Sequence, residues 1–333
     1  MKTEGWRIKC IDVIGLLGKT DIHWDLKPDI NILGGGNGSG KSTLLHALDI
    51  PFHMDSKEYN GIHCHAYFES FVLELYSGIK YHVKRLATTS QKELDLPINN
   101  GVEQKVVKTH QDISLSVEII SPQKNEVDFV QPSHCIYINT SDIAYRTINK
   151  LLEFSQQVKR PGSTMLDLLI EHALNERNKL FSQMVYNAMN KEDNKELSRL
   201  QNLFGRFDKV VSEFMPTYQL LNPSSLQFSI SDEDDNGILY HDLSTGEKQV
   251  LYILLKVTNT LGEPTLLFLD EPDLGMHIDW KKMLLKRLLK INPNMQIIAA
   301  THSPSLIDNM FDNVREISQL EISNKKIDGK LVN

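Results

Sequence analysis

The chain has 333 residues, 41% of them hydrophobic, and a formal net charge of −7 from 36 Lys and Arg against 43 Asp and Glu. This length and composition exclude a disordered chain and a single small module, and they predict one large or two medium domains with hydrophobic cores. The acidic balance excludes an all-over basic coat for DNA, although a local basic patch would still allow binding to nucleic acid or an anionic membrane.

The first 140 residues are dominated by strand patterns. Short apolar runs over residues 6–33 are interrupted by glycine and proline, and a helix is expected over residues 42–48. Residues 66–86 alternate apolar and polar side chains around a turn at Tyr76-Ser77-Gly78, which predicts an antiparallel hairpin. Two weaker strands are expected around residues 113–120 and 135–139.

Residues 141–222 have a helical pattern. Glycine is scarce, and apolar residues recur at intervals of three and four from Leu166 to Val185. Pro161 and Pro216 divide the segment, which argues against a single long antiparallel coiled coil. We interpret the apolar stripes as core faces in preference to a partner-binding surface, and we expect a helical insert.

Strand patterns return in the last third of the chain. A hairpin is expected between residues 226–230 and 238–240, and the acidic run 232–235 is interpreted as its solvated tip in preference to a metal site. The elements expected after it are a helix from about residue 247, a buried strand over 265–269, an amphipathic helix over 279–290 and a buried strand over 296–300. Strand, helix and strand in this order predict a parallel crossover unit.

The cysteines and the apolar runs indicate a cytoplasmic protein with reduced thiols. No segment approaches the roughly 18 uninterrupted apolar residues of a spanning helix, and the amino terminus lacks the apolar core of a signal peptide. Cys10, Cys64 and Cys135 are far apart and contain no CxxC pair, so neither a disulfide framework nor a thiolate zinc site is expected. The run His63-Cys64-His65, with His53 nearby, does not by itself form a chelate on a strand.

A phosphate loop follows the predicted strand that ends at residue 33. The run Gly35-Gly36-Asn37-Gly38-Ser39-Gly40-Lys41-Ser42 has glycine, four residues, then glycine, lysine and serine. Its glycines would let backbone N–H groups turn toward phosphates, and the next helix would present its positive end to them. Lys41 is expected to reach the β and γ phosphates and Ser42 to ligate Mg²⁺. The strand before the run and the helix after it argue against a flexible glycine linker.

Asp270 and Glu271 end the buried strand predicted over residues 265–269. Because ligands of open parallel sheets bind at the carboxyl ends of strands, Asp270 is expected to hold the Mg²⁺ shell and Glu271 to orient the attacking water. His302 follows the next buried strand, so it would emerge at the same edge and contact the γ-phosphate.

Ser244-Thr245-Gly246-Glu247 fits a helix capping box, because a serine is followed three residues later by a glutamate. The capped amino-terminal end of a helix beside a glycine is also an anion site. From these residues alone the cap is the preferred interpretation, and the two roles are compatible.

Together the motifs resemble those of the ABC-type ATPases, in the branch that contains RecF, the SMC-like proteins and the OLD-type ATPases. The resemblance implies an α/β fold: a P-loop NTPase of the ABC-ATPase head type, with an antiparallel β subdomain and a helical lid insert. The halves of the head would be residues 1–140 and 223–333, separated by a lid over residues 141–222. The similarity lies in four stretches that occur in the family's order, Gly36-Asn37-Gly38-Ser39-Gly40-Lys41-Ser42-Thr43, Leu243-Ser244-Thr245-Gly246-Glu247-Lys248-Gln249, Leu269-Asp270-Glu271-Pro272-Asp273 and Thr301-His302-Ser303-Pro304.

The resemblance also implies a site shared between two subunits. ATP and Mg²⁺ would be the cofactors, with Glu271, His302 and Lys41 in catalytic roles and Ser42 and Asp270 at the metal. Two subunits would dimerise head to tail, so that Ser244 and the Gly246 N–H of one contact the nucleotide of the other. The residues implied to bind the nucleotide within one subunit are Gly35, Gly36, Asn37, Gly38, Ser39, Gly40, Lys41, Ser42 and Thr43.

Some positions depart from the wider family. Leu274-Gly275-Met276-His277 stands where many members carry an aspartate, and it is similar to the OLD-type pattern. Thr245 replaces the glycine usual in transporters. In relatives a glutamine links the nucleotide to the lid. The sequence does not place this glutamine, and Gln131 is a candidate for it.

The expected function is an ATP-hydrolysing switch that controls a separate effector, such as a nuclease or toxin, as in the small ATPases of bacterial anti-phage defence that the chain resembles. A nuclease within this chain is not expected, because only a short tail follows His302. Two alternatives remain open: a RecF-like or SMC-like DNA-repair ATPase that binds DNA directly, and, less favoured, a transporter subunit. The basic side of the helix over 279–290 is interpreted as a solvated face in preference to a nucleic-acid surface.

Overall fold

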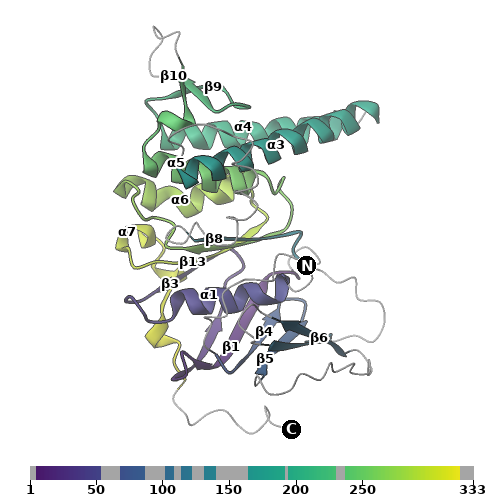
Figure 1. The fold of residues 1–333 in the computed structure, drawn as a ribbon, viewed down its shortest axis with the longest axis vertical. Helices are drawn as coiled ribbons and strands as arrows, with labels where there is room; N and C mark the ends of the chain where they lie inside the picture. Colours follow the sequence, from purple (N-terminus) through teal and green to yellow (C-terminus); the bar gives the residue numbers. More distant parts are fainter. Residues whose placement is uncertain are drawn as a thin grey trace.

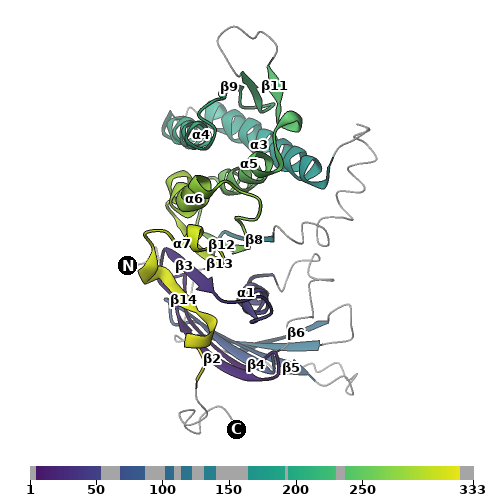
Figure 2. The same cartoon turned by 90° about the vertical axis from the view of Figure 1, so that its left-hand side faces the viewer.

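The computed structural model describes residues 5–53, 68–86, 102–108, 114–121, 131–139, 164–191, 194–229 and 237–322. Its elements form successive layers (Figures 1 and 2). A curved antiparallel sheet lies at one end, and helix α1 (Lys41–Asp49) separates it from a parallel sheet. Two pairs of helices and a small second antiparallel sheet lie beyond the parallel sheet.

The parallel sheet has the strand order β14-β3-β13-β12-β8. Every pair of neighbours in it is parallel, and β12 and β13 are consecutive strands joined through helix α6, which confirms the predicted crossover unit. All residues of β3, β12 and β13 are buried, as expected for strands covered on both faces. The strands are β3 (Ile30–Gly34), β8 (His134–Asn139), β12 (Thr265–Asp270), β13 (Met295–Ala300) and β14 (Val314–Glu316).

The large antiparallel sheet has the order β2-β1-β4-β5-β7-β6. Its β4–β5 pair confirms the predicted hairpin, and the carbonyl of Leu75 accepts the Gly78 N–H across the turn. The edge strand β6 was not predicted. The strands are β1 (Ile8–Leu16), β2 (Thr20–Asp25), β4 (Ser70–Leu75), β5 (Lys80–Leu86), β6 (Val102–Lys108) and β7 (Ser114–Ile120).

Alternation along β12 divides the interior into two cores. Leu266 and Phe268 belong to a core shared with α1 and the antiparallel sheet, whereas Leu267 and Leu269 belong to a core shared with the helices. Successive strand residues point to opposite faces, so one buried strand supplies both cores. The strands of the parallel sheet therefore lie between two packed layers.

The helices form two layers over the parallel sheet (Figure 1). Helices α5 and α6 lie next to the sheet, and α3 and α4 run side by side above them and extend past α5 and α6 at one end. None of the helices in the described part of the chain has the length and apolar character of a membrane span. The helices are α3 (Met165–Asn190), α4 (Asn194–Phe214), α5 (Thr245–Thr258), α6 (Ile278–Ile291) and α7 (Pro304–Ile307), with 3₁₀ turns η1 (Ile50–Phe52), η3 (Tyr240–Asp242), η4 (Phe311–Asn313) and η5 (Ile317–Gln319).

Among the described residues of the predicted helical insert, the helices run from Met165 to Asn190 and from Asn194 to Phe214. The last residues of the insert form the strand β9 (Gln219–Asn222), which pairs with β10 (Gln227–Ser229). The prediction of helix up to residue 222 is therefore wrong, because Pro216 ends the helical pattern and sheet pairing takes over. The β10 pairing with β11 (Ile238–Leu239) confirms the predicted hairpin, whose acidic tip lies outside the described residues, as do Pro161 and His63-Cys64-His65.

Replacing Phe207 with alanine tests whether α4 is held by its buried face. The side chain is 0% exposed and belongs to the core under the helices, so we expect the free energy of unfolding to fall by about 3–5 kcal/mol. Phe311→Ala is the control, because Phe311 is 74% exposed and its loss should cost about 0.5 kcal/mol or less. Urea unfolding of both variants measures the difference, and equal losses would contradict the assignment of the core.

Candidate functional site

The phosphate loop connects β3 to α1 at the carboxyl edge of the parallel sheet. Gly40, directly before α1, has φ 99°, and Gly35 has φ 146°, both in the region that glycine adopts without strain. A β-carbon on Gly35 would lie 2.9 Å from the Ser39 hydroxyl oxygen. Gly36, Asn37 and Gly38 are exposed, so the middle of the loop is open to a ligand.

Lys41 lies inside this loop. Its Nζ donates hydrogen bonds to the carbonyl oxygens of Gly35 at 2.9 Å and Gly36 at 3.0 Å, and lies 3.8 Å from Glu271 Oε1. The lysine side chain is 6% exposed, so its charge is held in the interior of the site. The ammonium group can exchange loop carbonyls for phosphate oxygens, which accept hydrogen bonds more strongly.

Asp270 is a buried carboxylate whose two oxygens differ in their hydrogen bonding. Its Oδ2 accepts hydrogen bonds from Tyr137 Oη at 3.2 Å and Asn139 Nδ2 at 3.3 Å. Its buried Oδ1 has no hydrogen-bond partner among the described residues. Burial raises the pKa of Asp270, and the hydroxyl groups of Ser42 and Tyr137 counteract this rise. A buried carboxylate oxygen without a partner, close to a hydroxyl, fits a Mg²⁺ ligand pair made by Asp270 and Ser42.

Glu271 links Lys41 to His302. Its Oε2 lies 2.7 Å from His302 Nδ1, and its Oε1 faces Lys41. Its backbone has φ 50°, an unusual value for a residue other than glycine, and its N–H donates to the Ala300 carbonyl. Strained backbone of this kind persists where the surrounding structure holds it, most often at functional sites. The structure thus brings three of the predicted catalytic residues together.

The loop after Glu271 is held by Asp273 and Thr301, which lie in the family stretches, and by Lys281, to which sequence reasoning gave no role in the site. Asp273 is 2% exposed, and its Oδ1 accepts a hydrogen bond from the Thr301 hydroxyl at 2.9 Å. Its Oδ2 lies 3.1 Å from Lys281 Nζ. These contacts join the segments that carry Glu271 and His302. No motif spacing identifies them, because Lys281 lies on the following helix and is drawn in only by the fold.

Ser244 caps α5, as predicted. Its N–H donates to Glu247 Oε2 at 2.7 Å, and the Glu247 N–H donates to Ser244 Oγ at 3.4 Å. Ser244 is exposed, and no hydrogen bond or ion pair between described residues joins it or Gly246 to the phosphate loop. Within one chain, the structure therefore does not place the stretch 243–249, which we call the signature, in the site formed by Lys41 and Glu271.

The start of α5 packs on the loop that follows β12. A β-carbon on Gly246 would lie 2.8 Å from the Gly275 carbonyl oxygen, so a larger residue does not fit there without a shift. Gln249 Nε2 donates to the Pro272 carbonyl at 2.8 Å. These contacts join the start of α5 to the loop that follows Asp270 and Glu271.

Helix α5 is also tied to the insert. Lys248 Nζ lies 2.8 Å from Asp167 Oδ1, and Asn259 Nδ2 donates to the Ala173 carbonyl at 2.9 Å. Asp167 caps α3 together with Thr164. Burial acts to raise the pKa of Asp167, but hydrogen bonds from Lys248 and Thr164 outweigh it and leave the pKa lowered. The Asp167 carboxylate is therefore ionised at neutral pH, and its contact with Lys248 connects α5 to α3.

Tyr137 and Asn139 are site residues that the sequence did not reveal. Both lie on β8, where Asn139 is the last residue and is paired in register with Asp270. Gln131, the candidate for the glutamine that links nucleotide to lid, is wrongly placed for that role. It is exposed and precedes the amino end of β8, whereas the site lies at the carboxyl edge of the sheet. The signal that could have revealed Tyr137 and Asn139 was the predicted strand over 135–139, because alternate residues of a strand share one face.

This geometry defines the class of the protein. The strand before His302 lies between the phosphate-loop strand and the strand that ends in Asp270, so all three segments meet at one sheet edge. The chain is an ABC-like ATPase of the branch that contains RecF, the SMC-like proteins and the OLD-type ATPases. It belongs to the family described as "AAA domain, putative AbiEii toxin, Type IV TA system", which matches residues 134–308, more than half of the chain.

Curated relatives have limited similarity. The chain is 24% identical to "Retron Ec83 probable ATPase" of Escherichia coli over 86% of its own length and 66% of that protein. It is 32% identical to "Septu protein PtuA" of Bacillus thuringiensis over 24% of each chain, and 24% identical to "Retron Vc95 probable ATPase" of Vibrio cholerae over 40% of its length and 28% of that protein. It thus spans less than two thirds of each of these relatives.

Among solved structures, the SMC head bound to the C-winged helix domain of ScpA aligns with a TM-score of 0.49 and 13% identity. The alignment covers 90% of this chain and 91% of that one.

Replacing Tyr137 with phenylalanine tests the support of Asp270. The change removes one hydrogen bond to the carboxylate and leaves the ring that stacks on His46. Loss of this hydrogen bond is expected to weaken Mg²⁺ binding at Asp270 by about 1 kcal/mol. We expect the Mg²⁺ concentration for half-maximal ATP turnover to rise roughly fivefold, with nucleotide binding in the absence of Mg²⁺ unchanged. Tyr186→Phe, on the exposed end of α3, is the control. An unchanged Mg²⁺ requirement in Tyr137→Phe would refute this role.

Proposed function

We propose that the chain binds ATP with Mg²⁺ and hydrolyses it. The observation that carries the proposal is the placement of Glu271 between Lys41 and His302, next to the buried carboxylate of Asp270. An acid, a phosphate-binding lysine and a histidine at one sheet edge supply the positioning and charge neutralisation that phosphoryl transfer requires. The names of the retron relatives, each a "probable ATPase", agree with this activity.

Each residue has a role in this proposal. Lys41 contacts the β and γ phosphates, and the N–H groups of residues 35–43 surround them. Ser42 and Asp270 would hold Mg²⁺, which when bound neutralises charge on the phosphates. Glu271 accepts a hydrogen bond from the attacking water and orients it, while His302, fixed by its contact with Glu271, senses the γ-phosphate.

The proposed active unit is a head-to-tail dimer. Ser244 is exposed at the amino-terminal end of the 14-residue helix α5, whose unsatisfied N–H groups favour an anion. Because no hydrogen bond or ion pair between described residues joins Ser244 to its own phosphate loop, the anion-binding end of α5 is available to a nucleotide on a second copy. ATP would then hold two subunits together, and hydrolysis would release them.

The proposed biological role is control of a separate effector, such as a nuclease or toxin, in anti-phage defence. Support comes from the retron and Septu relatives and from a family whose description names a toxin system. The link from α5 to α3 through Lys248 and Asp167 offers a path by which the nucleotide state reaches the insert.

Direct binding of DNA is not part of this proposal. The basic residues that suggested it on α6 are largely paired: Lys281 with the buried Asp273, and both Arg287 and Lys290 with Glu213. Such pairs reduce the positive field that attracts a phosphate backbone.

Glu271→Gln tests the hydrolytic step. The amide cannot accept a proton or orient water as the carboxylate does, so we expect turnover to fall by about 100-fold or more, with ATP still bound. In the presence of ATP, the Glu271→Gln protein should then accumulate as a stable dimer. Analytical ultracentrifugation with and without ATP and Mg²⁺ detects it. Glu263→Gln removes a carboxylate outside the site as the control. A monomeric Glu271→Gln protein with normal turnover would contradict the proposal.

Ser244→Arg tests the shared site. The bulky charge should block ATP-driven dimerisation and turnover while each monomer still binds ATP, because no hydrogen bond or ion pair between described residues joins Ser244 to its own phosphate loop. Mixing this variant with Lys41→Ala, itself unable to bind ATP, would create dimers with one intact site and restore part of the activity. Ser198→Arg, on the exposed surface of α4, is the control. Normal turnover by Ser244→Arg alone would show that the signature does not contact nucleotide.

A further inference from the structure

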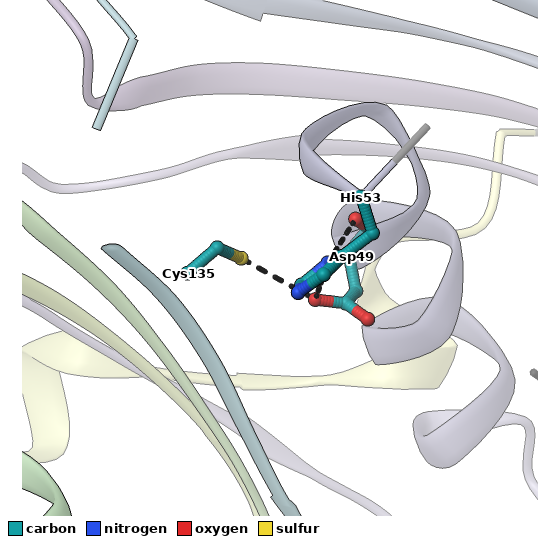
Figure 3. Close-up of side chains that lie close together, drawn as sticks. All are labelled: Asp49, His53 and Cys135. Atoms are coloured by element: carbon teal, nitrogen blue, oxygen red, sulfur yellow. Dashed lines mark hydrogen bonds and ion pairs between the residues drawn. The ribbon is translucent and has the colours of Figure 1, made fainter. Parts of the chain in front are cut away.

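Three side chains of metal-binding type converge at the carboxyl-terminal end of α1, the helix that follows the phosphate loop (Figure 3). Asp49 is the last residue of α1, His53 follows the 3₁₀ turn after it, and Cys135 lies on β8. Their ligand atoms all lie within 4.8 Å of one another. Asp49 Oδ1 is 3.0 Å from His53 Nδ1 and 3.3 Å from Cys135 Sγ.

The convergence follows from two periodicities. Ser42, His46 and Asp49 are four and three residues apart on α1, so they share one helix face. Cys135 and Tyr137 are two apart on β8 and share one strand face. The two faces meet: Tyr137 stacks on His46 with ring centroids 4.5 Å apart, and Cys135 meets Asp49 one step further along.

The Asp49 carboxylate is the buried member of this group. It is 1% exposed, and a buried carboxylate is costly unless a cation or several good donors compensate it. The thiol of Cys135 is a weak hydrogen-bond donor, and the imidazole of His53 supplies one further contact. A divalent cation between the three groups would neutralise the carboxylate and bind all three ligand atoms.

The ligand set points to a metal of the zinc class. Thiolate, imidazole and carboxylate together suit Zn²⁺, whereas Mg²⁺ takes oxygen ligands. Zn–ligand bonds of about 2.0–2.3 Å give tetrahedral edges of about 3.3–3.7 Å, so the present separations of 3.0 and 3.3 Å need to open by only a few tenths of an ångström. The His53 side chain is 22% exposed, which leaves a route for an ion to enter.

We propose that Asp49, His53 and Cys135 bind one divalent ion of the zinc class, with water in the fourth position. The ion joins the end of α1 to β8. These are the two elements that position Ser42, at the start of α1, and support Asp270 through Tyr137. The site is therefore distinct from the proposed Mg²⁺ site, yet it stabilises the framework that builds it.

Titration of the metal-free full chain with Co²⁺ tests the proposal. Thiolate-bound Co²⁺ has a charge-transfer absorption in the near ultraviolet, which the all-oxygen ligands Ser42 and Asp270 cannot produce. We expect this band to saturate at one Co²⁺ per chain and to be displaced by Zn²⁺. Cys135→Ser should abolish the band, and His53→Gln should weaken Co²⁺ binding by at least tenfold, on the scale of losing a metal-site interaction.

The other two cysteines provide matched controls. Cys10→Ser and Cys64→Ser should both retain the band and the stoichiometry. Far-ultraviolet circular dichroism and ATP binding check that Cys135→Ser is folded. As a second measurement, Zn²⁺ should raise the unfolding temperature of the wild type and raise that of His53→Gln by less at the same Zn²⁺ concentration.

Two results would overturn the proposal. The absence of a thiolate band in the wild type would mean that the three groups form only a hydrogen-bonded cluster. A band that survives in Cys135→Ser and disappears in Cys10→Ser or Cys64→Ser would place the metal elsewhere.

Discussion

The site depends on the register of four parallel strands. Asp270 is level with Asn139 on one side and with Ala300 on the other, and Ala300 is level with Leu33 on β3. Each strand therefore ends at the same height, and the residues that follow it emerge along one line. A slip of one residue at β12 would turn Asp270 to the other face of the sheet and separate it from Tyr137. Strand pairing, more than any single contact between side chains, sets the geometry of this edge.

Burial on both faces maintains this register. Leu266 and Phe268 face α1 and the antiparallel sheet, and Leu267 and Leu269 face the helices. A shift of β12 would move apolar side chains out of both cores at once, at a cost of about 1.5–3 kcal/mol for each side chain that becomes exposed. The same packing holds α5 against the loop after β12, so the signature, the carboxylates and α3 form one connected body.

The sequence was informative wherever a feature is local. The phosphate loop, the strand-end acids, the Ser244 cap and the β4–β5 hairpin each depend on neighbouring residues, and the structure has the cap and the hairpin as predicted. It was less informative at sheet edges: β6 and β14 were missed because these edge strands carry little alternation of their own and form where a partner strand is available. The helical prediction failed at residues 219–222 for the same reason, since pairing with β10 decided that segment.

The sequence by itself determined which chemical groups this protein carries and the order in which they occur, because loops, caps and strand ends are set by short-range backbone preferences. Only the tertiary structure decided which groups meet. Tyr137 reaches Asp270 across a separation of 133 residues, and Cys135 reaches Asp49 across 86. Motif spacing argued against a thiolate metal site, because the cysteines are isolated along the chain. Contacts at these separations come from strand register and helix packing, which depend on burying two cores at once.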